Sequence, residues 1–128
     1  MKNIAITENH LYKKTYQRGS HAAGGCVVMY VLRDTHAHLL MKANPLKRKV
    51  NRVGISVPKK FGSAVERNRA KRIIREAYRL LEKESPLKKG YLIVLAVRDG
   101  AKGKKMQDVL RELRRCARRL ELISDAEV

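Results

Sequence analysis

The chain has 128 residues, with 30 Lys or Arg against 12 Asp or Glu, so its formal net charge is +18. This length suits one domain, and the charge favours nucleic acid as the partner because a polyanion relieves the self-repulsion. The lack of Trp, the single Phe and the lack of any long apolar run exclude a membrane span and argue against a membrane-surface helix.

The first predicted element is a short helix over residues 7–19, which begins at Thr-Glu-Asn and ends at a glycine. Four of its side chains, at positions i, i+1, i+4 and i+5, form a stripe along one side of the helix that includes Tyr12 and Tyr16. We expect residues 20–25 to form a loop of small residues. Residues 26–32 are a β-branched run of strand length, and both sets of alternating side chains are apolar. This pattern predicts a strand covered on both faces.

Residues 33–52 have the least regular pattern in the chain. We expect residues 36–42 to continue a hairpin and residues 44–49 to form a basic turn. The stretch as a whole is predicted to be a mobile, poorly defined excursion. Strand character resumes at residues 52–57, and a cationic loop over residues 58–62 follows.

The longest predicted helix covers residues 64–84. Ser63 and Glu66 have the spacing of a capping box, and Pro86 follows the last turn. At about 100° per residue, one arc of this helix is apolar: Ala70, Ile73, Ile74, Ala77, Leu80 and Leu81. The opposite pole is polar and cationic, flanked by two further arginines: Asn68, Lys71, Arg72, Arg75 and Arg79, with Arg67 and Arg69 beside them. One face of the helix is therefore expected to pack, and the other to present a row of cations.

The last two elements are a strand and a helix. Residues 91–97 form an almost unbroken apolar run, which predicts a central strand. Residues 104–122 have apolar side chains at helical spacing with five arginines on the remainder, which predicts a second basic amphipathic helix. The order is α-β-β-α-β-α, or α-β-β-β-α-β-α-like with one further strand. We therefore expect an α+β fold, an α/β sandwich in which a small sheet packs against helices.

Two readings of the charged and aromatic residues stay open. A row of cations is often only a solvated face, but this row has one sign and continues the loop that contains Lys59 and Lys60. Both features favour phosphate binding. Tyr12, Tyr16 and Tyr30 are candidates to stack on unpaired RNA bases. Ordinary core packing is the alternative for these tyrosines.

The sequence assigns no catalytic residue and no metal ligand to the protein itself. His36 and His38 would share a strand face but lack a third ligand nearby, and no paired carboxylates suit two-metal phosphodiester cleavage. Cys26 and Cys116 are far apart in sequence and are expected to be small buried hydrophobes. Because the N-terminus lacks an apolar signal core, we expect a cytoplasmic protein.

Residues 52–76, which read RVGISVPKKFGSAVERNRAKRIIRE, resemble the signature segment of the bacterial ribonuclease P protein subunit. The Arg-Asn-Arg core at residues 67–69, followed by Lys-Arg and a further Arg, is highly specific. The resemblance extends over most of the chain. It includes the two tyrosines before Gly19 in the first helix and Tyr30 in the first long strand.

The resemblance implies a ribosomal protein S5 domain 2-like fold with a left-handed crossover through helix 64–84. It also implies a single RNA-binding domain over residues 1–128, acting as the protein component of a ribonucleoprotein endoribonuclease. In that family a catalytic RNA, paired with one protein chain, holds Mg²⁺ and removes the 5′ leader from precursor tRNA. The residues carried over to RNA binding are Lys59, Lys60, Arg67, Asn68, Arg69, Lys71, Arg72, Arg75 and Arg79. Those carried over to a leader-binding cleft are Tyr12, Tyr16 and Tyr30, with Lys59 and Lys60 nearby.

Two alternative functions use the same cations. A structural RNA-binding protein of ribosomal or chaperone type would bind RNA without any cleavage partner. A protein-only nuclease would cleave RNA in the absence of a catalytic RNA, with a metal ion held by the protein.

Overall fold

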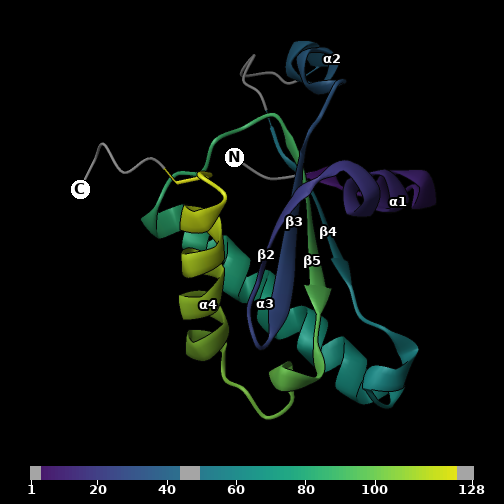
Figure 1. The fold of residues 1–128 in the computed structure, drawn as a ribbon, viewed down its shortest axis with the longest axis vertical. Coiled ribbons are helices and arrows are strands. Elements are labelled where there is room, and N and C mark those ends of the chain that lie inside the picture. The colour runs from purple at the N-terminus through teal and green to yellow at the C-terminus, as the bar shows by residue number, and fades with distance from the viewer. Residues whose placement is uncertain (1–3, 44–49, 124–128) are drawn as a thin grey trace.

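In the computed structural model of the chain, residues 4–43 and 50–123 are described, and a five-stranded sheet lies at their centre (Figure 1). The strands, in spatial order, are β1 (Ile4–Ala5), β4 (Arg52–Ser56), β5 (Tyr91–Val97), β3 (Val27–Arg33) and β2 (Ser20–Ala23). β4 runs parallel to β1 and β5, whereas β3 runs antiparallel to β5 and β2. β5 is the middle strand, as its apolar run predicts.

The described residues include four α-helices: α1 (Asn9–Arg18), α2 (Ala37–Ala43), α3 (Ala64–Glu84) and α4 (Met106–Arg119). Two short 3₁₀ turns, Lys59–Phe61 and Asp99–Ala101, follow β4 and β5. α3 connects β4 to β5, which are neighbouring parallel strands. The mixed α+β architecture is confirmed, and the predicted α-β-β-β-α-β-α order is present once β1 and α2 are set aside.

α3 has the bounds and the cap that the sequence predicts. The Ser63 hydroxyl accepts from the backbone N–H of Glu66, and the Glu66 carboxylate accepts from the backbone N–H of Ser63. These hydrogen bonds also hold the pKa of Glu66 below its usual range. The buried side chains of α3 follow the predicted arc, with the addition of Tyr78: Ala70, Ile74, Ala77, Tyr78 and Leu81.

The two faces of the sheet are covered to different extents. α3 and α4 pack over one face, where the core includes Met29, Ile93 and Leu95. A smaller apolar cluster on the other face joins Leu11 of α1 to Leu92 and Val94 of β5. Because α1 has only ten residues, part of this second face stays open to solvent.

Two of the predicted local structures are wrong. Residues 20–23 form strand β2, because they pair with β3 and bury Ala22 in the core. Residues 37–43 form helix α2, because the Asp34 carboxylate accepts the backbone N–H of His36 and the backbone turns into a helix there. The predicted basic turn at 44–49 lies outside the described residues.

The end of the predicted excursion is buried. Asn51 is fully buried, donates its side-chain N–H to the carbonyl of Lys88 at 3.0 Å, and accepts the backbone N–H of Tyr91 at 3.0 Å. Asp34 accepts a two-pronged hydrogen bond from Arg52, with N–O distances of 2.7 and 2.8 Å. These polar contacts connect the ends of β3, β4 and β5.

The ion pair between Asp34 and Arg52 predicts an acid-sensitive stability. Burial raises the pKa of Asp34, but hydrogen bonds from Arg52 and His36 outweigh it and hold the pKa below its usual value of 3.8. The carboxylate therefore stabilises the fold above that value, and its contribution is lost as the pH falls through the lowered pKa. Asp34→Asn is expected to cost about 1–2 kcal/mol at neutral pH and to flatten the dependence of unfolding free energy on pH. Urea titrations from about pH 6 to pH 3 measure this, and an unchanged pH slope would contradict it.

Candidate nucleic-acid interface

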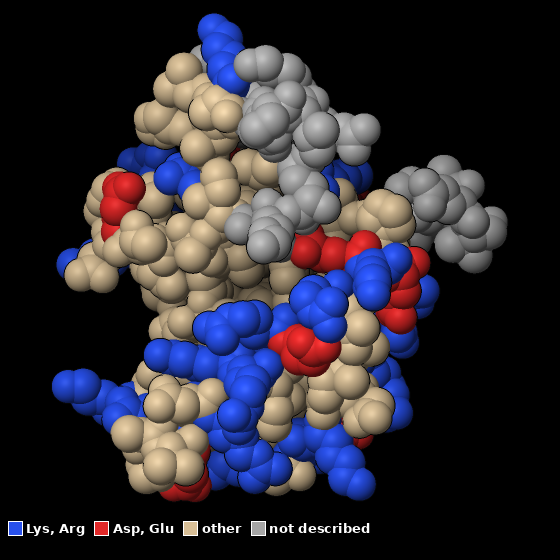
Figure 2. All heavy atoms as spheres, turned by 180° about the vertical axis from the view of Figure 1, so that it is seen from behind, with Lys and Arg blue, Asp and Glu red and all other residues tan. Residues whose placement is uncertain are grey.

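The exposed face of α3 carries the cations that its periodicity predicts. The candidate RNA-binding residues of the helix are all exposed or half-buried: Arg67, Asn68, Arg69, Lys71, Arg72, Arg75 and Arg79. Figure 2, which views the molecule from behind, shows Lys and Arg gathered across the lower half of this face, where α3 crosses. Arg79 is paired with Glu76 at 2.5 Å. The run of unpaired positive charge within the described residues therefore ends before Arg79.

Lys59 and Lys60 extend this cationic face toward β4. Both lie exposed in the 3₁₀ turn Lys59–Phe61, and buried Phe61 anchors the turn in the core. They are not among the residues that line the groove described next.

A groove of about 570 Å³ runs between α3 and the β1–β4 edge of the sheet. Its cationic wall comes from α3, and its apolar wall comes from the two strands and α1. The lining residues include Ile4, Ile6, Tyr12, Val53, Ile55, Lys71, Arg75, Tyr78 and Arg79. The structure thus places one predicted leader-binding residue, Tyr12, in the same groove as Lys71 and Arg75 of the predicted RNA-docking helix.

Tyr12 is positioned by a glycine. A Cβ atom on Gly54 would lie 2.4 Å from the Tyr12 hydroxyl oxygen, so the ring occupies the space that a side chain on β4 would take. The Tyr12 hydroxyl lies 3.5 Å from the Ile6 carbonyl. Burial, followed by the neighbouring Tyr16, raises the pKa of Tyr12 above 10.0, so its hydroxyl stays neutral.

Tyr30 and Tyr16 form an aromatic cluster next to this position. Their ring centroids are 4.9 Å apart, with an edge-to-face angle of 82°. His21 on β2 lies 5.6 Å from the Tyr30 ring. Strand pairing aligns Gly54, Val94, Tyr30 and His21 in one row across four strands. Tyr12 lies over Gly54 at one end of this row and Tyr16 packs against Tyr30 within it, so the three predicted tyrosines lie on the same face of the sheet.

The next row of the same face is made of small side chains. It contains Ser56, Ala96, Val28 and Ala23, aligned by the same strand pairings. All four are half-buried or exposed. The aromatic row thus borders a flat surface without bulky side chains, a shape that leaves room for an extended ligand.

His21 is a candidate site residue that the sequence did not reveal. Residues 20–25 were predicted as a loop, and a loop offers no register that would align His21 with Tyr30. The sequence Ser-His-Ala-Ala over residues 20–23 has no polar–apolar alternation and no β-branched residue, so it does not predict a strand.

Within residues 4–43 and 50–123, no group of three or more His, Cys, Asp or Glu side chains is placed to hold a metal ion. His36 lies in the turn before α2 instead of on a strand. Across the same ranges, no helix is long and apolar enough to cross a membrane.

The family model described as Ribonuclease P matches residues 1–121. This chain belongs to the ribonuclease P protein family. The ribonuclease P protein component of Clostridium acetobutylicum is 36% identical over 109 residues, which cover 85% of this chain and 82% of that relative. The corresponding protein of Lachnoclostridium phytofermentans is 32% identical over 123 residues, which cover 96% and 94%. The family resemblance is therefore confirmed over nearly the full length.

Solved structures of ribonuclease P proteins share the fold. The Staphylococcus aureus protein aligns with a TM-score of 0.73 and 25% identity, covering 96% of this chain and all of that one. The Thermotoga maritima ribonuclease P protein aligns with a TM-score of 0.61 at 22% identity, which shows the fold alone. The overall fold of this chain is thus that of solved ribonuclease P proteins.

Proposed function

We propose that this chain is the protein component of a ribonuclease P ribonucleoprotein that removes the 5′ leader from precursor tRNA. One catalytic RNA per protein chain holds the Mg²⁺ ions and carries out the hydrolysis. The protein binds that RNA and the leader. The observation that carries this proposal is the groove that joins Lys71 and Arg75 of α3 to Tyr12, at the end of the aromatic row on the open sheet face.

The α3 face suits the phosphate backbone of a folded RNA. Arg67 and Arg69 lie on two sides of the Asn68 pole, and a guanidinium group can donate two parallel hydrogen bonds to one phosphate. The face has an unpaired run of cations at helical spacing, so one side of the helix can meet several phosphates. Contacts of this kind supply affinity and position without reading sequence.

The open sheet face suits a single strand with unstacked bases. Tyr16 is 38% exposed, and its ring stands nearly perpendicular to that of Tyr30, so the exposed part of the ring can take a base. The row of small side chains beside it lets an extended backbone lie close to the sheet. Stacking tolerates any base because each has a π-face, which fits leaders of varied sequence.

Reconstitution with a bacterial ribonuclease P RNA at low Mg²⁺ tests the proposal. The full-length protein is expected to increase the rate of leader removal and to bind precursor tRNA more tightly than mature tRNA. Lack of any rate gain would contradict the proposal. Co-purification with ribosomal RNA alone would point to a structural RNA-binding protein, and Mg²⁺-dependent cleavage by RNA-free protein would point to a protein-only nuclease.

Tyr16→Ala is expected to weaken the binding of precursor tRNA by about 1–2 kcal/mol, or roughly tenfold, through the loss of one stacked base. Because the ring is outside the two buried clusters, the fold should be retained, with some stability lost through the missing contact with Tyr30. Equilibrium binding of the reconstituted complex to precursor and mature tRNA measures the effect. Tyr16→Phe keeps the ring and should bind as the unsubstituted protein does. An equal loss of affinity for mature tRNA would place the contact outside the leader.

A further inference from the structure

A second concentration of arginines lies on α4, at the other side of the fold from the α3 groove. Five arginines recur at helical spacing and line a common hollow: Arg111, Arg114, Arg115, Arg118 and Arg119. Arg114 is paired with Glu84 at 2.7 Å. The other four form no ion pair with an acid in the described part of the chain. Their charges are thus available to a ligand.

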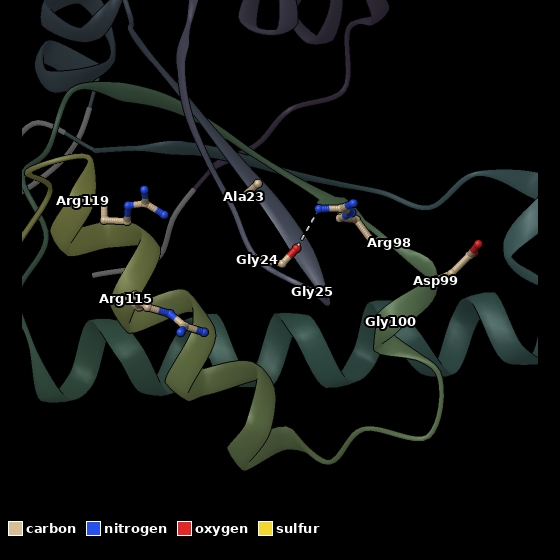
Figure 3. A pocket seen from close by; sticks show the side chains of 8 residues that line it. All are labelled: Ala23, Gly24, Gly25, Arg98, Asp99, Gly100, Arg115 and Arg119. Carbon is tan, nitrogen blue, oxygen red and sulfur yellow. Dashed lines mark hydrogen bonds between the residues drawn. The ribbon is translucent and has the colours of Figure 1, made fainter.

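Two of these arginines also line a pocket of about 480 Å³ against the sheet. Figure 3 shows Arg115 and Arg119 on one side of this pocket and Arg98, at the end of β5, on the other. Arg98 donates a hydrogen bond to the Gly24 carbonyl at 3.0 Å. In the same view Asp99, the only acid among the lining residues, points away from the arginines. Three guanidinium groups therefore surround one pocket.

The wall of this pocket is fixed by a buried carboxylate. Glu112 is 6% exposed and accepts the backbone N–H groups of Cys26 and Val27 at 2.7 and 3.0 Å. It thereby ties the β2–β3 turn to α4. The packing is close, since a Cβ atom on Gly24 would lie 1.9 Å from Glu112 Oε1. The position of Arg115 on α4 relative to the β2–β3 turn is consequently fixed.

The α4 pocket and the α3 groove lie at opposite edges of the sheet. The groove is formed with β1 and β4, and the pocket with the β2–β3 turn and the end of β5. In the order β1-β4-β5-β3-β2, β1 and β4 stand at one end and β3 and β2 at the other, with β5 between them. No residue lines both. An RNA segment bound in the α3 groove therefore leaves the α4 arginines free.

The chemistry of the surface favours RNA over a membrane or a protein. Guanidinium groups match phosphodiester oxygens with paired hydrogen bonds, whereas membrane-surface helices and protein interfaces add exposed aromatic or large apolar side chains. Within the described residues the exposed large hydrophobics are on other elements: Ile4, Tyr16, Leu39 and Val65. We propose that Arg98, Arg111, Arg115, Arg118 and Arg119 form a second phosphate-binding surface, which holds an RNA segment distinct from the one on α3. This inference rests on one part of the proposed function, that the protein binds RNA.

Salt-dependent binding of the full chain to transcribed ribonuclease P RNA tests this surface. Arg115→Gln/Arg119→Gln is expected to lower the slope of log affinity against log salt by about 2 and the affinity about tenfold, through two lost phosphate contacts. Arg115→Lys/Arg119→Lys should retain most of the slope because it keeps both charges. Hydroxyl-radical footprinting should show lost protection at nucleotides other than those affected by Arg67→Ala/Arg69→Ala.

The matched control is Arg33→Gln/Lys88→Gln, which removes two exposed cations from other elements and should leave the slope nearly unchanged. The inference would be overturned if this control lost as much salt slope as the α4 variant, or if the α4 variant kept the slope of the unsubstituted protein. It would also be overturned if the α4 and α3 variants lost protection at the same nucleotides. If the α4 variant lost binding to phosphatidylglycerol vesicles but bound RNA normally, the surface would bind lipid instead of RNA, which would also overturn the inference. Cleavage assays run in parallel separate the two proposals. If the protein gives no gain in leader removal but the α4 variant still lowers the salt slope of RNA binding, only the proposed function is contradicted.

Discussion

Replacing Glu112 with Ala is expected to lower the free energy of unfolding by about 4 kcal/mol, because it leaves two buried N–H donors without an acceptor, each costing about 1–3 kcal/mol. The donors are the backbone N–H groups of Cys26 and Val27, and both bond to the same carboxylate oxygen. The loss also detaches the β2–β3 turn from α4. Urea denaturation at neutral pH measures the change.

Glu112→Gln is the matched control for this prediction. The amide oxygen of Gln can accept from the same two N–H groups, so the variant should lose much less stability than Glu112→Ala. Equal destabilisation by the two substitutions would mean that the negative charge, and not the oxygen acceptor, matters at this position. An Ala variant as stable as the unsubstituted protein would contradict the role of Glu112 altogether.

Arg67→Ala/Arg69→Ala is expected to weaken association with the catalytic RNA by about 10- to 100-fold and to lower the salt slope by about 2, through two lost phosphate contacts. Arg69 is exposed and Arg67 is half-buried, so removal of both side chains also removes the fork around Asn68. Titration of labelled RNA with protein over a range of salt concentrations gives both quantities.

Two control variants separate charge from geometry in this experiment. Arg67→Lys/Arg69→Lys keeps both charges but loses the paired hydrogen bonds, so its slope should stay close to that of the unsubstituted protein while its affinity falls. Lys83→Ala removes an exposed cation near the end of the same helix and should have little effect. A slope for the double Ala variant equal to that of the unsubstituted protein would exclude direct phosphate contact by these arginines.

The sequence predicts the elements whose signals are local. α3 spans the predicted 64–84 because its cap, Ser63 with Glu66, and its stop before Pro86 are contained in a few adjacent residues. β5 matches the predicted 91–97 because an apolar run of that length needs burial on both faces. The packing arc of α3 follows from helical periodicity, although Tyr78 was not on the predicted arc.

Elements that depend on distant partners were not predicted. β2 is made of small residues that carry little strand signal, and it exists because β3 supplies its hydrogen-bond partners. α2 replaced a predicted hairpin through a turn at Asp34, whose carboxylate is held by Arg52, 18 positions away. Glu112 had a weak signal, since it is an acid placed among the core-facing positions of a basic helix, between Val109 and Leu113.

By itself, the sequence determined the bounds of the cationic helix, which of its faces packs and which carries the cations, and the family of the chain. The capping residues, the periodicity and the Arg-Asn-Arg spacing that decide these points are all contained in one continuous segment. Only the tertiary structure decided which residues meet that helix. The strand order β1-β4-β5-β3-β2 brings Tyr12 over Gly54 and into one groove with Lys71 and Arg75. Strand register aligns Tyr30 with His21. Such contacts join residues far apart along the chain, so their geometry depends on how the whole sheet packs.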